Sequence, residues 1–330
     1  MNIRNRLWDA ARVGSKKGLP ILSFPAAQKL GVTVETLVKS AELQARAMEI
    51  VTRDTATIAA VSLMDLSVEA EAFGAKVRFT EDEVPAIVGQ LISDEDEANE
   101  LEVPDLNAGR ANLCIEAVRT AKATITDKPV LAGMIGPYSL AGRLCDVTEI
   151  MYLCFDEPET VHTVLDKATQ YLIQYGQAMK DAGADGIMMA EPLAGILSPN
   201  MAEEFSMPYV KRIIDALQDE NFAVIYHNCG NSVPQMLQAI YGLGAAAYHF
   251  GNAIDMGSVL SATPADILVM GNIDPAGQFA SGSVESITAA TRELLEQCGS
   301  YPNFVPSSGC DIPAHAKWEN IDAFFAAVEG

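Results

Sequence analysis

Three side chains that bind soft metal ions occupy two segments far apart in the sequence. His227 and Cys229 lie in the run His-Asn-Cys-Gly, and Cys310 lies much further along the chain. Each group follows an apolar, strand-like run, at residues 222–226 and 303–307. Because residues i and i+2 of an extended segment point to the same side, His227 and Cys229 can bind one ion. One imidazole and two thiolates favour Zn²⁺, and three protein ligands leave a fourth position for substrate, so the sequence predicts a catalytic zinc.

Each of these ligands has an ordinary explanation when it is taken alone. A single buried cysteine such as Cys310 usually behaves as a small hydrophobe, and His227 could be a core histidine with a satisfied hydrogen bond. The metal interpretation is favoured because Cys310 follows Gly309 beyond a strand, and because His227 and Cys229 share a strand end with Gly230.

Further ionisable residues follow expected strands and are candidates for catalysis. Glu191 is the carboxylate best placed for a proton or metal role, although Glu191-Pro192 could simply start the next segment. Asp65 ends the run from Ala59, and a buried cap is its alternative role. His249 lies in an alternating Tyr-His-Phe run and is either a group supporting the site or a structural residue.

Two turn-forming positions are candidates for contact with a ligand or cofactor. Gly136, before Pro137, ends the expected strand 129–135 and could offer backbone amides. Asp274, before Pro275, could equally be a turn former or a helix cap, as Asp before Pro often is.

Eight apolar runs alternate with longer amphipathic segments, which favours an α/β fold with a parallel sheet. The expected strands are 20–24, 57–64, 129–135, 186–190, 222–227, 245–250, 266–271 and 303–307. The expected helices include 35–51, 158–182, 201–217, 233–241 and 283–297. This pattern predicts one (β/α)₈ barrel over residues 1–330, in which the polar strand ends meet at one mouth.

Residues 67–108 interrupt the alternation of apolar runs and amphipathic segments. This interruption predicts a decorated connection between an early strand and the helix that follows it. Gly74 suggests a turn between two short segments, and acidic runs occupy 80–83 and 93–97. A solvated surface loop explains the acidic runs, and a docking face for a partner protein is the alternative.

Charge and composition exclude several functions. The formal net charge of −22 disfavours nucleic acid and anionic membranes as partners. Six scattered cysteines in a chain of 330 residues favour a reducing, cytoplasmic setting. The first residues lack the apolar stretch of a signal peptide, and no apolar run is long enough to cross a membrane. The oligomeric state stays open.

Several motifs resemble the uroporphyrinogen decarboxylase superfamily and, within it, the methylcobamide:coenzyme M methyltransferases. They are Ser62-Leu-Met-Asp65, Gly136-Pro-Tyr-Ser139, Gly271-Asn-Ile-Asp-Pro275 and Gly309-Cys-Asp-Ile-Pro313. The His-x-Cys pair with a distant cysteine is specific to the methyltransferase branch. The resemblance implies a single TIM barrel and zinc held by His227, Cys229 and Cys310.

The chain departs from the decarboxylases at the segment expected to hold the substrate. Decarboxylases resembling this chain carry arginines after the first strand, whereas Ile21–Leu30 contains none. A porphyrinogen with many carboxylates needs such a cluster on an acidic protein. Asp65 matches the decarboxylase aspartate, but Cys310 stands where a decarboxylase histidine is expected, which favours methyl transfer.

The resemblance implies a methylated corrinoid as methyl donor, carried by a separate corrinoid protein. The acceptor would be a thiol such as coenzyme M, or a pterin such as tetrahydrofolate. Arg143, which follows the Gly-Pro motif, is a candidate for receiving the sulfonate of coenzyme M. Two alternatives remain: a uroporphyrinogen decarboxylase, and a zinc- or corrinoid-binding barrel without turnover.

Overall fold

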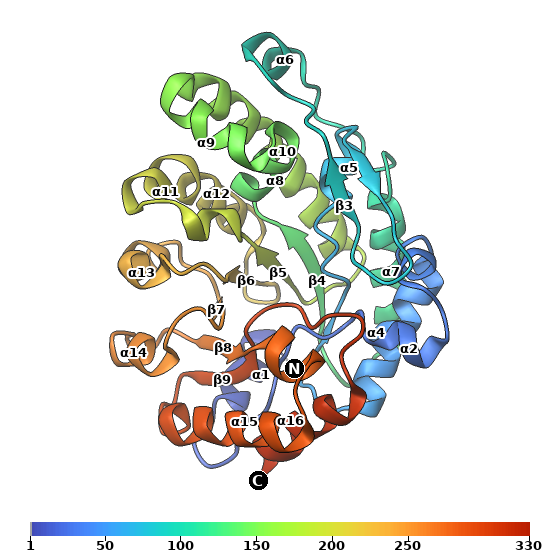
Figure 1. The fold of residues 1–330 in the computed structure, drawn as a ribbon, viewed down its shortest axis with the longest axis vertical. Coiled ribbons are helices and arrows are strands. Elements are labelled where there is room, and N and C mark those ends of the chain that lie inside the picture. Colours follow the sequence, from blue (N-terminus) through green and yellow to red (C-terminus); the bar gives the residue numbers. More distant parts are fainter. Residues whose placement is uncertain (1) are drawn as a thin grey trace.

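A curled, parallel seven-stranded sheet, surrounded by helices, forms the centre of the molecule (Figure 1). The computed structural model describes residues 2–330. The strands of this sheet are β1 (Ala60–Val61), β4 (Val130–Ile135), β5 (Gly186–Ala190), β6 (Ala223–Asn228), β7 (Ala247–Phe250), β8 (Val269–Ile273) and β9 (Phe304–Ser308). The strands lie side by side in that order, so each one pairs with the strand before it and the strand after it in this series. The α/β barrel class predicted from the sequence is confirmed.

Helices separate the strands, as parallel connections require. The first half contains α1 (Ile3–Ala10), α2 (Ala26–Leu30), α3 (Val34–Val38), α4 (Ala41–Asp54), α5 (Val68–Ala72), α6 (Glu95–Glu100), α7 (Ala111–Thr124) and α8 (Pro137–Cys145). The second half contains α9 (Val147–Asp156), α10 (Pro158–Asp181), α11 (Pro199–Phe205), α12 (Met207–Leu217), α13 (Val233–Tyr241), α14 (Met256–Ser261), α15 (Val284–Cys298) and α16 (Trp318–Glu329). Two short helical turns, η1 (Leu193–Ile196) and η2 (Pro275–Ala280), follow β5 and β8.

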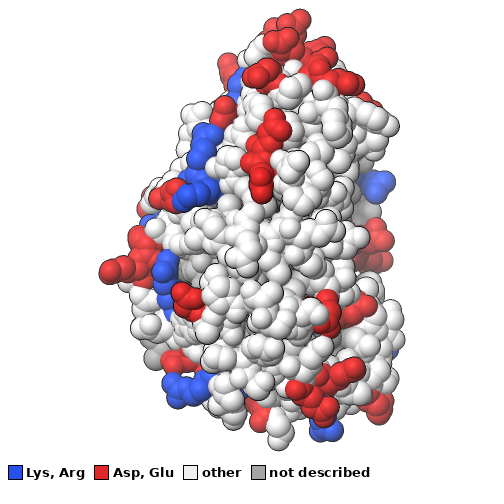
Figure 2. Space-filling view, turned by 90° about the vertical axis from the view of Figure 1, so that its left-hand side faces the viewer, with Lys and Arg blue, Asp and Glu red and all other residues white. Residues whose placement is uncertain are grey.

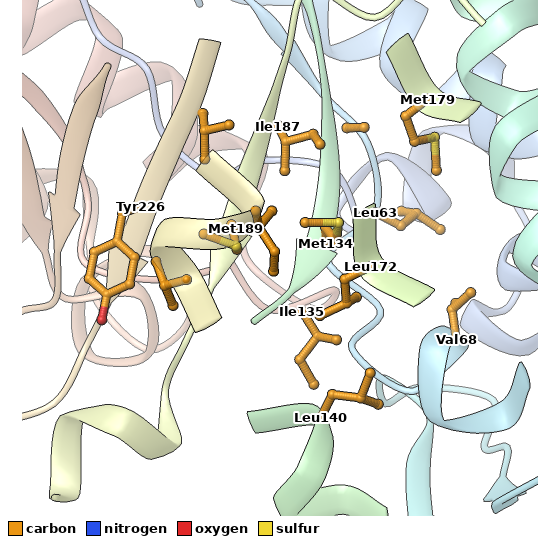
Figure 3. Close-up of a cluster of buried hydrophobic side chains, with 14 of the residues drawn as sticks. Leu63, Val68, Met134, Ile135, Leu140, Leu172, Met179, Ile187, Met189 and Tyr226 are labelled. Carbon is orange, nitrogen blue, oxygen red and sulfur yellow. The ribbon is translucent and has the colours of Figure 1, made fainter. Parts of the chain in front are cut away.

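Side chains alternate along each strand between the inside of the barrel and the layer of helices. On β5, Met188 and Ala190 belong to the interior cluster, whereas Ile187 and Met189 belong to the outer core. Figure 3 shows side chains of β4 and β5 beside Leu172 of α10 in this outer core. Burying each such side chain contributes roughly 1.5–3 kcal/mol.

Helix α1 contributes to the interior cluster rather than to the outer layer. Its residues Ile3, Leu7 and Ala10 are buried with the inward-facing residues of the strands. Because this cluster fills the inside of the barrel, the interior is a packed core. Chemistry is therefore confined to the carboxyl ends of the strands.

The strand predicted at 20–24 is wrong, because residues 20–23 form no strand and Phe24 lies in a turn. Residues 18–21 nevertheless lie between the two edges of the sheet: Leu19 N–H donates to the Pro306 carbonyl and Ile58 N–H to the Gly18 carbonyl. Side chains of β9, and not only its backbone, form hydrogen bonds with the backbone of this segment. The Ser308 hydroxyl accepts from Ile21 N–H at 3.0 Å, and the Ser307 hydroxyl donates to the Leu19 carbonyl at 2.7 Å.

Two helices predicted as continuous are each divided. The predicted helix 35–51 becomes α3 and α4, because the Ser40 hydroxyl accepts from Leu43 N–H and starts a new helix there. The predicted helix 201–217 becomes α11 and α12, which are separated at Ser206. The helices predicted at 158–182, 233–241 and 283–297 are confirmed within two residues as α10, α13 and α15.

The decorated connection at 67–108 contains α5, an antiparallel pair of strands and α6. The strands are β2 (Lys76–Arg78) and β3 (Ala86–Val88), and Gly74, with φ of 101°, forms the predicted turn before β2. The acidic run at 93–97 is not a loop throughout, because Asp94 caps a short exposed helix, α6. Figure 2 shows acidic side chains gathered at this end of the molecule. Among residues 2–330, no helix is long and apolar enough to cross a membrane.

Candidate metal centre at the barrel mouth

His227 lies in the uppermost layer of the barrel interior. The inward-facing residues of β6 are Ala223 and Ile225, and alternation places His227 next in the same row. The same rule applies to His249 after Ala247 on β7 and to Ser307 after Val305 on β9. These three side chains therefore replace apolar residues where the packed core ends, and each is at least 98% buried.

His227, Cys229 and Cys310 converge as predicted. Their ligand atoms all lie within 4.8 Å of one another, and His227 Nε2 lies 3.5 Å from Cys310 Sγ. Bond lengths of about 2.05 Å to nitrogen and 2.3 Å to sulfur, at a tetrahedral angle, give a nitrogen–sulfur separation of about 3.5 Å. The donor set and its spacing therefore fit a zinc ion.

A close approach of two loops holds Cys229 in place. A Cβ atom at Gly251 would lie 2.6 Å from the Cα and Cβ atoms of Cys229, so a side chain at position 251 would displace the cysteine. Hydrogen bonding with Cys310 and the neighbouring imidazole of His227 lower the pKa of Cys229 to about 4, against the effect of burial. The same pairing and burial raise the pKa of Cys310. A divalent cation binds the deprotonated form of cysteine, so it would displace the protons of these thiols.

His249 contacts His227 and is not one of the three side chains that could hold a metal ion. Its Nδ1 lies 2.8 Å from Nδ1 of His227, and its Nε2 lies 2.7 Å from the Ser307 hydroxyl. Burial and the neighbouring His227 hold the pKa of His249 well below its usual value, so this imidazole is neutral. Its predicted catalytic role stays a prediction, and its geometry is that of a residue that positions His227.

Glu191 is buried and binds the first turn of α8. Its carboxylate accepts from Tyr138 N–H at 3.0 Å, from Ser139 N–H at 2.7 Å and from the Ser206 hydroxyl at 3.1 Å. Gly136 makes this possible, because a Cβ there would lie 2.6 Å from the carboxyl carbon. Burial raises the pKa of Glu191, while these hydrogen bonds oppose the rise. The structure gives Glu191 and Gly136 a role in anchoring α8, and catalytic or ligand contact by them stays a prediction.

Asp65 forms a buried ion pair that the sequence did not indicate. Its carboxylate pairs with Arg110, and the hydroxyl and N–H of Ser67 donate to it at 2.6 and 3.1 Å. Arg110 also binds Glu71, with 2.6 Å between Nε and the carboxylate. Arg110 therefore balances the charge of Asp65, and a catalytic role for Asp65 stays a prediction.

Three further polar side chains near Asp65 have buried atoms without a hydrogen-bond partner among residues 2–330: Glu69 Oε2, Arg143 Nε and Asp311 Oδ1. Glu69 accepts from Ile135 N–H at 3.0 Å through its other oxygen. Burial raises the pKa of Glu69 to about 7 and lowers that of Arg143. Arg143 forms no ion pair with any described residue, although the charges of Glu69 and Asp65 act on it, and contact with a ligand stays a prediction.

Asp274 acts as a helix cap. Its carboxylate accepts from Ala276 N–H at 3.0 Å and from Gly277 N–H at 2.9 Å, at the start of η2. This is the structural alternative considered for it, and contact with a ligand or cofactor stays a prediction.

The site residues missed by the sequence are Arg110, Glu69 and Ser307. Ser307 carried a usable signal, since it is a polar residue at a strand end, like His227 and His249. Arg110 and Glu69 carried none, because they reach Asp65 and Ile135 from helical segments through tertiary contacts.

Comparison with known proteins gives one family and two kinds of relative. Residues 21–330 match the model of the Uroporphyrinogen decarboxylase (URO-D) family. A methylcobamide:CoM methyltransferase MtbA from Methanosarcina acetivorans is 25% identical over 236 residues, which cover 70% of this chain and 69% of the relative. A uroporphyrinogen decarboxylase from Hydrogenovibrio crunogenus is 27% identical over 281 residues, which cover 82% of this chain and 78% of the relative.

A solved structure shares the fold over the whole length. A methyltransferase from Methanosarcina mazei superposes with a TM-score of 0.89 at 24% sequence identity. The superposition covers 99% of this chain and 98% of the other. The fold of this chain is therefore shared with that protein.

Proposed function

The chain belongs to the uroporphyrinogen decarboxylase family, and from this premise we propose that it is a zinc-dependent corrinoid methyltransferase. The reaction would move a methyl group from a methylated corrinoid to a thiol such as coenzyme M, or to another acceptor such as tetrahydrofolate. The observation that carries the proposal is the convergence of His227, Cys229 and Cys310 at the barrel mouth. The similarity to a methylcobamide:CoM methyltransferase supports the same activity.

A bound zinc would keep a thiol acceptor in its nucleophilic thiolate form near neutral pH. The rest of the chemistry belongs to the two substrates. The acceptor sulfur would form a bond to the methyl carbon as the bond from that carbon to the cobalt of the donor breaks, and the electron pair of the broken bond would stay with the donor.

The protein residues would orient the acceptor and exclude competing groups. His227, Cys229 and Cys310 would hold the zinc, and a set of three protein ligands would leave room on it for the acceptor sulfur. Arg143, with no ion-pair partner among residues 2–330, would receive the sulfonate or carboxylate of the acceptor. Asp65 and Arg110 neutralise each other and would hold the mouth in shape.

A separate corrinoid protein would deliver the methyl group to the barrel mouth.

The cysteines of the chain suit a cytoplasmic enzyme. All six are free thiols, including three that are buried away from the site. The reducing cytoplasm keeps such thiols and the two zinc-binding cysteines from oxidation.

Methyl transfer from methylcobalamin to a small set of acceptors tests the proposal. Zinc-loaded protein should convert methylcobalamin to cob(I)alamin under anaerobic conditions when 2-mercaptoethanesulfonate is present, followed by absorbance and by the methylated product. Tetrahydrofolate is the second acceptor to be tried. Absence of product with every acceptor, in protein that carries zinc, would favour a binding barrel without turnover.

A further inference from the structure

A chain of hydrogen bonds connects the metal-binding histidine to the backbone of the N-terminal segment. It runs from His227 Nδ1 to His249 Nδ1 at 2.8 Å, from His249 Nε2 to the Ser307 hydroxyl at 2.7 Å, and from that hydroxyl to the Leu19 carbonyl at 2.7 Å. All three side chains are at least 98% buried, so water does not compete for these groups.

The hydrogen bond between Ser307 and Leu19 determines which atom donates in each of the other hydrogen bonds. A carbonyl oxygen can only accept, so the Ser307 hydroxyl donates its one hydrogen to Leu19. The Ser307 oxygen must then accept from His249 Nε2–H. A neutral imidazole with hydrogen on Nε2 has a lone pair on Nδ1, which accepts from His227 Nδ1–H.

A second contact independently supports the same hydrogen position on His227. Its Nδ1 also lies 3.3 Å from the backbone carbonyl of His249, which again can only accept. Two acceptors therefore face Nδ1 of His227. The hydrogen on Nδ1 leaves a lone pair on Nε2, the atom that lies 3.5 Å from Cys310 Sγ.

We propose that His249, Ser307 and the Leu19 carbonyl together select the His227 tautomer that presents Nε2 to the metal ion. His249 and Ser307 are then positioning residues, and the extended segment 18–21 belongs to the metal centre. This explains why Ser307 binds Leu19 in place of a regular strand ladder. The inference rests on the proposed metal site but not on methyl transfer.

Nitrogen-15 NMR of histidine-labelled protein tests the tautomer directly. The chain has four histidines, so long-range hydrogen–nitrogen correlations can be assigned with one variant for each. In metal-free protein, His227 should carry its hydrogen on Nδ1, and it should keep this hydrogen when zinc binds. A hydrogen on Nε2 of His227 in the metal-free protein would overturn the proposal, whether or not the enzyme transfers methyl groups.

Neighbouring serines provide matched variants for zinc affinity. Ser307→Ala removes the link to His249, whereas Ser308→Ala removes only the acceptor for Ile21 N–H. Loss of such a supporting contact typically weakens metal binding by about 10–100-fold. Competition with a chelator should show this loss for Ser307→Ala and no comparable loss for Ser308→Ala. Equal affinities of the two variants would contradict the proposed role.

Substitution of His249 separates positioning from simple packing. His249→Asn places an amide oxygen where Nδ1 was and can accept from His227, whereas His249→Phe fills the space without an acceptor. We expect the asparagine variant to bind zinc more tightly than the phenylalanine variant, and to keep the Nδ1–H signal of His227. Tighter binding by the phenylalanine variant would count against the hydrogen-bond chain.

Discussion

His227, Cys229 and Cys310 lie where the apolar interior of the barrel ends, and none of them belongs to its hydrophobic cluster, so the core can form without a metal ion. Alanine at any of the three positions should abolish stoichiometric zinc binding, and alanine at Cys229 or Cys310 should change the free energy of unfolding of the metal-free protein by less than about 2 kcal/mol. Elemental analysis and denaturant unfolding measure the two effects. Cys114→Ala is the control, since Cys114 is partly buried like Cys229 and Cys310. Full zinc occupancy in Cys310→Ala would remove Cys310 from the ligand set.

Glu69 should make stability depend on pH. Burial raises its pKa from 4.5 to about 7, so the folded protein binds this proton more tightly than the unfolded chain does. The stabilisation is fully present below about pH 4.5 and is lost as pH rises through about 7, by roughly 3 kcal/mol in total. Glu69→Gln mimics the protonated group and still accepts from Ile135 N–H.

The stability of Glu69→Gln relative to the unsubstituted protein should therefore increase between pH 5 and pH 8. Urea unfolding at a series of pH values measures the difference. Glu81→Gln, at an exposed position, should show little change over the same range. A pH-independent difference for Glu69→Gln would mean that Glu69 titrates normally in the folded protein.

At the scale of elements, the alternation of side chains along the strands made much of the site predictable. Seven of the eight expected strands form, and their polar ends bring His227 and Cys310 together. The strand expected at 20–24 does not form, because the hydroxyls of Ser307 and Ser308 form hydrogen bonds with backbone groups of Leu19 and Ile21. No local sequence pattern reveals these contacts. The break at Ser40 could have been found from its helix-capping residue type. The partners of Asp65 and Glu69 could not have been found from the sequence, because these contacts depend on long-range packing.

The junction of β5 and α8 depends on Glu191. Replacing it with alanine leaves the amides of Tyr138 and Ser139 without their acceptor, which costs about 1–3 kcal/mol for each buried group. We expect Glu191→Ala to lower the free energy of unfolding by about 2–5 kcal/mol and Glu191→Gln to lower it less. Unchanged stability of Glu191→Ala, together with lost methyl transfer, would instead assign Glu191 to catalysis. Glu203→Ala, at an exposed helix position, is the control.

At the scale of the whole molecule, charge argues against a porphyrinogen substrate. The net charge is −22, and the face in Figure 2 carries acidic groups, with some Lys and Arg side chains among them, around a largely uncharged centre. Where decarboxylases are expected to carry arginines, Gln28 donates to the carbonyls of Ala314 and Ala316 at 2.6 and 2.8 Å. A cavity of about 530 Å³ beside Gln28 is lined by Glu81, Asp82 and Glu83. These carboxylates would repel a polycarboxylate.

We therefore predict no conversion of uroporphyrinogen to coproporphyrinogen by the purified protein. The measurement is chromatography of the porphyrins after anaerobic incubation, with a uroporphyrinogen decarboxylase as positive control. Conversion at a rate comparable to that control would show that the family resemblance to decarboxylases extends to activity.

In the proposed reaction, a zinc ion held by His227, Cys229 and Cys310 takes the sulfur of the methyl acceptor as its fourth ligand. X-ray absorption at the zinc edge, recorded with and without 2-mercaptoethanesulfonate, detects this sulfur. Two sulfur ligands are expected in the resting protein and three after the thiol is added, with Zn–S distances of about 2.3 Å. A sulfur count that stays unchanged in protein that actively methylates the thiol would contradict the account.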